Sequence, residues 1–434
     1  MISIREGSLQ KTAGKVYIGY DLGNVFSQIS YLRTGSEEPI SVSLVAGTEQ
    51  YNIPTVLAKR QGIGQWYYGK EAIKYSSNGC ILVDDLLSKA IRGEEVMVED
   101  EPYDPVALLT LFVKRSLGLL TMHVTTKDIE AFMFTTPVLN ERIVEVLGRV
   151  VAGLNLKCEV ITYQSHVESF YDYILHQPKE LWQYQVLAFD FNEKLTAMRL
   201  EVSENTRPKV VIIHKNSYDD IEPYTPVEDE KTNALNAERL DGRFLKICEK
   251  ETEDQDVGTV YLLGEGFREG WTKESLKVLC KNRRVFQGNN LYSKGACFAL
   301  LDKLRPGDLS KEYVYLGEDK IKSNVGVKAI RRGEDSYYAI LDAGTAWYEA
   351  SADFDMILEE GNEFSFVITS LTGGSVTEKT MVLDGLPERA RGTTRLGFHV
   401  EMSTINSLQI EVTDKGFGQI IKPSGMAWNL NIVI

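Results

Sequence analysis

Apolar residues in the first 300 positions occur in short runs whose spacing changes between that of strands and that of helices. The spacing predicts an apolar strand, a tight turn and a second strand in residues 15–33, and a buried strand over 129–135. Asp104 before Pro105 predicts the start of a mostly apolar, buried helix. Asn140 is a suitable N-cap for a second helix. The apolar residues on one face of that helix are Ile143, Val146, Leu147, Val150 and Val151.

A second block repeats this alternation of strands and helices. Residues 185–202 predict a hairpin, and residues 209–214 predict a third strand. We expect a helix over 232–251, a strand over 259–263 and another helix over 272–281. Two blocks in which strands alternate with helices predict an α/β fold built from two similar halves.

The pattern changes at residues 304–308 (LRPGD), which have the composition of a turn. Beyond them come short alternating segments such as 363–371, separated by Gly, Asp and Asn. Short strands with frequent turns and no convincing helix predict an all-β domain, either a sandwich or a barrel. We therefore expect an α/β domain over 14–303 and a β-domain over 306–434.

The chain of 434 residues carries a formal net charge of -14, from 48 basic and 62 acidic residues. That balance disfavours nucleic acid or an anionic membrane as the main partner, because phosphate binding needs a positive surface. Five cysteines and five histidines are dispersed without a metal-binding spacing, which is typical of reduced thiols in a reducing compartment. We find neither the apolar core of a signal peptide nor an apolar run of membrane-spanning length. These features predict a cytoplasmic protein.

A series of short motifs carries a resemblance that spans nearly the whole chain. In the α/β domain the motifs lie at residues 18–24 (IGYDLGN), 53–56 (IPTV), 134–137 (FTTP), 190–196 (DFNEKLT), 260–268 (VYLLGEGFR) and 295–296 (GA). In the β-domain they lie at 383–387 (LDGLP), 408–412 (LQIEV) and 414–416 (DKG). Each motif is weak alone. Their shared order and spacing resemble those of the bacterial-type seventy-kilodalton heat-shock (DnaK-like) chaperones, which belong to the actin-like ATPase superfamily.

The resemblance implies a two-lobed actin-like ATPase fold, followed by a C-terminal β-sandwich similar to the chaperones' substrate-binding domain. About 65 residues separate Thr196 from Val260, roughly half of what the chaperones have there. We therefore expect a reduced outer subdomain in the second lobe. The chain ends at Ile434, directly after the β-domain, so we expect no helical lid.

The resemblance also implies a site. In this superfamily two glycine-rich hairpins hold phosphates by backbone N–H groups, and carboxylates hold a hydrated divalent metal. The implied catalytic residues are Asp21, Lys89 and Asp190, and the two aspartates would hold Mg²⁺ through water. The implied nucleotide-binding residues are Gly23, Asn24, Asn192, Thr196, Gly264, Gly266 and Arg268. The ordinary alternatives are turn aspartates, a solvated helix lysine, and a tight turn with a surface arginine.

The phosphate loops depart from the family pattern. Asn24 and Val25 replace a pair of hydroxyl residues, and Asn192, Glu193 and Lys194 replace three glycines. Glycine lets a backbone approach phosphate closely, and each missing donor weakens binding. The loops therefore predict weak phosphate binding and poor hydrolysis.

The sequence favours a divergent, lidless DnaK-like chaperone or polypeptide-binding protein, whose partner is an extended polypeptide or another protein. ATP or ADP with Mg²⁺ are the implied cofactors, and little or no hydrolysis is expected. Two alternatives stay open: an active ATPase with unusual phosphate loops, and an actin-like assembly or scaffold protein. The fold alone does not separate them, because one fold hosts several functions.

Overall fold

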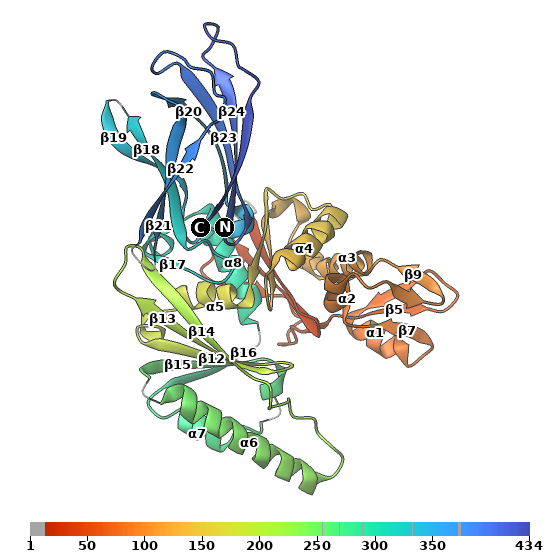
Figure 1. Cartoon of the computed structure of the whole chain (residues 1–434). Coiled ribbons are helices and arrows are strands. Elements are labelled where there is room, and N and C mark those ends of the chain that lie inside the picture. The colour runs from red at the N-terminus through yellow and green to blue at the C-terminus, as the bar shows by residue number, and fades with distance from the viewer. Residues whose placement is uncertain (1–13, 254, 269, 289, 332, 372–374) are drawn as a thin grey trace, which may run out of the picture. The chain divides into compact units, whose positions relative to one another are not determined.

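The computed structural model describes residues 14–253, 255–268, 270–288, 290–331, 333–371 and 375–434, and Figure 1 shows its elements. These residues form two compact units. Unit 1 contains the described residues up to Glu201 together with Ile213–Lys311. Unit 2 contains Val202–Ile212 and Glu312–Ile434.

The predicted boundary lies at residues 303–306. The observed division differs from it, because the first residues of one strand, β14 (Lys209–Tyr218), belong to unit 2 and the rest of that strand belongs to unit 1. β14 pairs in parallel with β17 (Tyr313–Tyr315), and Lys209 lies opposite Tyr313. The Lys209 ammonium is also 2.8 Å from the Glu204 carboxylate and 3.2 Å from that of Glu312. These interactions join the start of β14 to the last residue of the one-turn helix α9 (Asp308–Glu312) and to β17, which follows it.

The first sheet of unit 1 has the order β11-β10-β1-β2-β3, and β4 also pairs with β2. Its strands are β1 (Val16–Leu22), β2 (Phe26–Arg33), β3 (Ile40–Ser41), β4 (Ile53–Pro54), β10 (Ile129–Thr136) and β11 (Val160–Ser165). β1 runs antiparallel to β2 and parallel to β10. Every residue of β1 is buried, as expected of a strand whose sheet is covered on both faces.

Helices cover the two faces of this sheet. On one face the Tyr20 hydroxyl lies 2.7 Å from the Ser116 hydroxyl of α3 (Pro105–Ser116). Gly19, the preceding residue, faces the opposite side, where a Cβ would lie 2.1 Å from the Ser293 carbonyl oxygen of α8 (Leu291–Leu304). Only glycine allows α8 to pack this closely.

Glycine is also required where α8 crosses α5 (His166–Leu175). A Cβ on Gly295 would lie 1.9 Å from the Ser169 carbonyl oxygen of α5. The Gly295-Ala296 pair in the sequence is therefore explained by close helix packing, because Ala296 is fully buried beside Gly295.

The first sheet, together with α1–α5 and α8, is called the first lobe below. Its remaining elements are α1 (Gly69–Ser76), α2 (Leu86–Arg92), α4 (Glu141–Leu154), β5 (Leu57–Arg60), β6 (Trp66–Tyr68), β7 (Cys80–Val83), β8 (Val96–Val98) and β9 (Glu101–Tyr103). Both predicted helix starts are confirmed. The Asp104 carboxylate accepts from the Val106 N–H at 2.9 Å, and the Asn140 side chain accepts from the Ile143 N–H at 3.0 Å.

The second sheet has the order β16-β15-β12-β13-β14-β17, and its last strand, β17, belongs to unit 2. With α6 and α7, which lie against one of its faces in Figure 1, it is called the second lobe. Its elements besides β14 are β12 (Gln185–Phe191), β13 (Leu195–Ser203), β15 (Val257–Leu263), β16 (Arg284–Gly288), α6 (Glu230–Thr252) and α7 (Glu274–Leu279). The regular elements formed by the described residues between β13 and β15 are β14 and α6. The aromatic side chains of its core are Phe189, Phe191, Phe244, Phe267 and Trp271.

One segment, Pro105–Met122, is long and apolar enough to cross a membrane by length and composition, with a mean hydropathy of 1.4. This is contrary to the expectation that no apolar run reaches that length. The segment consists of α3 and the 3₁₀ turn that follows it. In the structure α3 packs against α2 and α4, with Leu109 and Phe112 fully buried.

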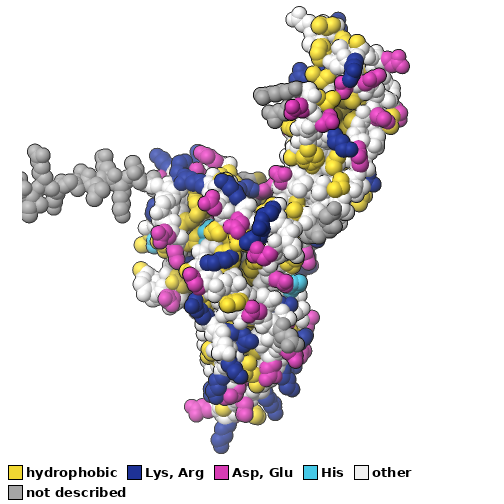
Figure 2. Space-filling model, turned by 90° about the vertical axis from the view of Figure 1, so that its left-hand side faces the viewer, with side chains coloured by type: hydrophobic (Ala, Val, Ile, Leu, Met, Phe, Trp, Pro, Cys, Tyr) yellow, Lys and Arg dark blue, Asp and Glu magenta, His cyan; other side chains and the backbone are white. Residues whose placement is uncertain are grey.

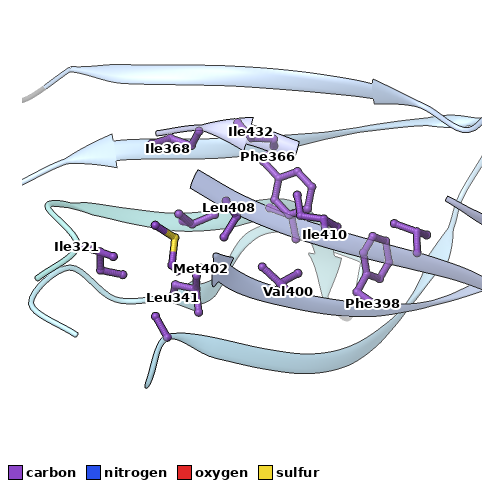
Figure 3. Close-up of a cluster of buried hydrophobic side chains, with 14 of the residues drawn as sticks. Ile321, Leu341, Phe366, Ile368, Phe398, Val400, Met402, Leu408, Ile410 and Ile432 are labelled. Carbon is purple, nitrogen blue, oxygen red and sulfur yellow. The ribbon is translucent and has the colours of Figure 1, made fainter. Parts of the chain in front are cut away.

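Unit 2 contains two antiparallel sheets, with the orders β19-β18-β21-β22 and β20-β23-β24-β25. The strands are β18 (Ser323–Arg331), β19 (Glu334–Leu341), β20 (Ser351–Leu358), β21 (Glu363–Ser370), β22 (Val376–Val382), β23 (Thr394–Thr404), β24 (Ser407–Gly416) and β25 (Ala427–Val433). Side chains from both sheets form one apolar core, which includes Phe366 of β21 and Phe398 of β23 (Figure 3).

Candidate functional site

A pocket of about 260 Å³ lies in unit 1, between the two lobes. It is lined by the β1–β2 turn, the β12–β13 turn, the first residues of α5 and the first residues of α8. In α/β sheets the space beyond the carboxyl ends of parallel strands is the usual ligand site. The pocket has this location, because β1 and β12 both end in it.

Two carboxylates and two aromatic side chains form a continuous set on the wall of the pocket. Asp21, at the end of β1, shares a 2.7 Å hydrogen bond with Nε2 of His166 in α5. The Tyr292 hydroxyl of α8 donates to Asp190 Oδ2 of β12 at 2.6 Å. The His166 and Tyr292 rings stack with centroids 3.9 Å apart and planes inclined by 10°. Each carboxylate is therefore engaged by an aromatic group of the first lobe.

Burial shifts the pKa of two residues of this set, Asp190 and Tyr292. Removal from water raises the pKa of Asp190, and the Tyr292 hydrogen bond and nearby His166 oppose that rise. Burial also raises the pKa of Tyr292 well above 10, and the neighbouring Asp190 carboxylate acts in the same direction. Tyr292 therefore keeps its proton near neutral pH and acts as the donor to Asp190.

The structure brings most of the residues proposed from the sequence to this pocket. Those that line it are Asp21, Gly23, Asn24, Asp190, Asn192, Thr196 and Gly264. Gly264 has φ +94°, and a Cβ there would lie 2.6 Å from the Phe191 carbonyl oxygen. That position therefore requires glycine for its backbone conformation and for its packing.

Three other proposed residues do not line the pocket. The Lys89 ammonium is 3.0 Å from the Asp84 carboxylate. Arg268 pairs with Glu265 at 2.9 Å, one turn away. Gly266 packs against Phe191, since a Cβ would lie 2.7 Å from that ring.

The amide side chains in the two turns are also engaged by protein groups. Asn24 donates to the Asp85 carboxylate at 2.8 Å and accepts from the Ser88 N–H of α2 at 3.2 Å. Asn192 donates to Asp190 Oδ1 at 2.8 Å and accepts from the Glu265 N–H at 3.2 Å. Both turns therefore use their polar side chains to hold neighbouring elements.

His166, Tyr292 and Lys215 line the pocket, and the sequence reasoning missed all three. A signal existed for His166, because Ser165 and Glu168 have the spacing of a capping box. The Ser165 hydroxyl accepts from the Glu168 N–H at 3.2 Å, which makes His166 the first residue of α5. No local signal marks Tyr292, because its partner Asp190 lies 102 positions away.

These residues do not fit the magnesium–triphosphate group that the resemblance implies. The two carboxylates that would hold the hydrated metal accept hydrogen bonds from His166 and Tyr292. Glu193 adds a carboxylate to the lining, and Lys194 lies 2.8 Å from Asp219. Within the described ranges, no three His, Cys, Asp or Glu side chains are arranged to hold a metal ion.

A larger concavity, the unit 2 groove, has a volume of about 1110 Å³. It is lined by residues of β18, β19, β21 and β22 in one sheet and of β20 and β23 in the other. Among these strands, β19 and β20 are edge strands of their sheets. Its apolar lining includes Val327, Ile330, Tyr337, Met356, Ile357, Leu358, Phe364, Leu396 and Phe398. Ile330, Tyr337 and Ile357 are 57%, 46% and 54% exposed. Exposed apolar side chains grouped in one concavity are typical of a binding surface.

The rim of this groove is acidic. The carboxylates that line it are Asp335, Asp355, Glu359, Glu360, Glu363 and Glu378, and the one lysine is Lys328. Three of these carboxylates form ion pairs, with Arg395, Arg391 and Lys328. In the upper part of Figure 2, which is unit 2, hydrophobic side chains likewise lie among carboxylates. The groove therefore combines an apolar floor with a net negative rim.

Two family models match the chain. A model described as the C-terminal part of a family of unknown function, DUF5716, matches residues 38–318. A model described as a domain of unknown function, DUF8552, matches residues 320–434. The comparison with curated proteins found no match. The two matched ranges meet within the first residues of the longer segment of unit 2.

Proposed function

The chain belongs to the DUF5716 C-terminal family, and we propose that it is a cytoplasmic, DnaK-like polypeptide-binding protein. In this proposal unit 2 binds an extended segment of another protein, and unit 1 has an actin-like fold that does not hydrolyse ATP. The geometry of the unit 2 groove carries the proposal.

The unit 2 groove suits an extended chain because it is bordered by two edge strands. Edge strands have unpaired main-chain groups, which an added strand can satisfy. β20 alternates exposed residues with half-buried ones, namely Ala352, Phe354, Met356 and Leu358. These half-buried side chains pack against the core, and they leave pockets suited to alternate residues of a bound segment.

The acidic rim adds a charge preference to this apolar recognition. Only one of the seven charged residues that line the groove is basic. A segment whose apolar residues are flanked by lysine or arginine therefore gains favourable electrostatic interactions at the rim. Such interactions mainly increase the rate of association and the selectivity for the partner.

The absence of hydrolysis is supported by the state of the unit 1 pocket. Phosphoryl transfer depends on positioned phosphate donors, a metal and an oriented water. In this chain Asp21 and Asp190 are engaged by aromatic groups, and Lys89 pairs with Asp84 outside the pocket. This arrangement disfavours the alternative of an active ATPase with unusual loops.

The proposal is tested by fluorescence anisotropy, with the full-length chain titrated into labelled extended peptides. We expect a leucine-rich peptide flanked by lysines to bind with a Kd of about 1–100 µM. The same peptide flanked by glutamates should bind more weakly.

Paired variants locate the binding. The double variant Ile330→Ser, Ile357→Ser should weaken binding at least about tenfold, because it removes two exposed apolar contacts. Ile420→Ser, at an exposed apolar residue of unit 2 outside the groove, should leave binding unchanged. Equal affinity in both variants, or no binding of any peptide by the wild type, would exclude the groove as the site.

A further inference from the structure

Two sets of hydrogen bonds join the lobes of unit 1 on either side of the pocket. Tyr292 of the first lobe donates to Asp190 of the second at 2.6 Å. The Asn52 amide, which precedes β4 in the first lobe, donates to Glu265 of the second. Asn52 is itself held from its own lobe by the Gln28 amide of β2.

The contact through Tyr292 is rigid, because it is anchored in the first lobe. Tyr292 and His166 are 5% and 9% exposed, and their rings are stacked. His166 is fixed by Asp21, and Tyr292 lies at the start of α8, which packs against β1, β2 and β10. The contact between the lobes therefore costs little side-chain conformational entropy.

Two carboxylates that face one buried space repel each other unless an electropositive group lies between them. A hydrated cation bound with a nucleotide could be the electropositive group between the two carboxylates. The residues of this pocket, however, do not fit a magnesium–nucleotide complex. We propose that Tyr292 and His166 form a built-in clasp, whose hydrogen bonds to Asp190 and Asp21 offset this repulsion and hold the two lobes together without any ligand.

This proposal rests on the proposed function and extends it, because the two lobes of unit 1 then stay joined whether or not a nucleotide is present. A chain that closes without a ligand has no nucleotide-dependent opening to transmit. The clasp lies wholly in unit 1, and the proposed peptide site lies in unit 2. Either proposal can therefore fail while the other stands.

The test is hydrogen–deuterium exchange on the full-length chain, followed at the segments 20–26 and 188–194 that carry the two turns. Tyr292→Phe removes only the hydroxyl that reaches Asp190. We expect exchange at both segments to rise about tenfold, because the loss of one buried hydrogen bond shifts local opening by that order.

A matched control removes a phenol hydroxyl that stays within one lobe. Tyr224→Phe removes the contact with Asn233 of the second lobe, outside both measured segments. It should not change exchange across the pocket by more than about twofold. Asn52→Ala, which removes the hydrogen bond to Glu265, should add to the effect of Tyr292→Phe.

Two results would overturn the clasp. One is a Tyr292→Phe chain whose exchange matches that of Tyr224→Phe at both segments. The other is a wild-type chain in which magnesium with ATP strongly slows exchange at these segments. If the lobes are already joined by their own side chains, a nucleotide should not slow exchange further.

Discussion

At the residue scale, the most strongly held charge in the described part of the chain is Asp414 of unit 2. Its carboxylate accepts two hydrogen bonds from the Arg389 guanidinium, at 2.7 and 2.5 Å, and two more from the N–H groups of Gly416 and Ser424. The Arg389 side chain is 6% exposed and that of Asp414 is fully buried. The Arg389 guanidinium holds the pKa of Asp414 well below its usual range.

Arg389→Met should lower the free energy of unfolding by about 3–5 kcal/mol, because it leaves a buried carboxylate without its cation. Arg391→Met breaks an exposed pair with Glu359 and should cost less than about 1 kcal/mol. Urea unfolding of both variants measures the difference. Equal costs would mean that Asp414 is solvated in the folded protein.

The same ion pair predicts the direction of a pH effect. The pKa of Asp414 is lower in the folded chain than in the unfolded chain, where it is about 3.9. Its stabilisation is therefore complete above that unfolded value and is lost as the pH falls below it. The free energy of unfolding of the wild type and of Arg389→Met is measured with urea at each pH. The difference between the two should be constant from pH 6 to 8 and should become smaller in acid.

At the element scale, local sequence patterns were sufficient to predict where some helices begin and insufficient to predict where others do. The helix starts after Asp104 and Asn140 were predictable because their caps lie within three residues. The start of α7 was placed two residues early, because its cap is Asp241, which lies in α6.

β14 and the pocket show the same limit. β14 extends to Tyr218, beyond the predicted end at His214, where Asn216 and Tyr218 donate to the buried Glu251 of α6. In the pocket, Asp21 and Asp190 were predictable from their turns. The pairing of Asp190 with Tyr292 required the packing of α8 against the first sheet, which no local sequence pattern encodes.

Asp241 gives the element-scale prediction. Its carboxylate accepts from the N–H groups of Lys273, Glu274 and Ser275 at 2.7–3.1 Å and so caps α7. Asp241→Ala should destabilise the second lobe by about 1–3 kcal/mol and raise amide exchange across α7. Asp229→Ala, which removes the exposed cap of α6, should cost about 1 kcal/mol. An α7 that stays fully protected in Asp241→Ala would contradict this account.

At the scale of the whole molecule, the two units have different chemistry. Unit 1 has a pocket in which Asp21, Asp190, His166 and Tyr292 are linked by hydrogen bonds and ring stacking. Unit 2 has a groove lined by exposed apolar side chains. Phosphate release from ATP by the full-length chain should therefore stay at background. Lys89→Ala should not change it, because Lys89 pairs with Asp84 outside the pocket. Turnover above background that disappears in Lys89→Ala would restore the ATPase alternative.

The central claim, polypeptide binding that does not depend on a nucleotide, is tested most directly by one titration. The affinity of the full-length chain for the lysine-flanked, leucine-rich peptide is measured with and without magnesium and ATP. We predict a micromolar Kd, equal within about twofold in the two conditions. No binding in either condition, or a Kd that changes about tenfold or more when the nucleotide is added, would contradict the account.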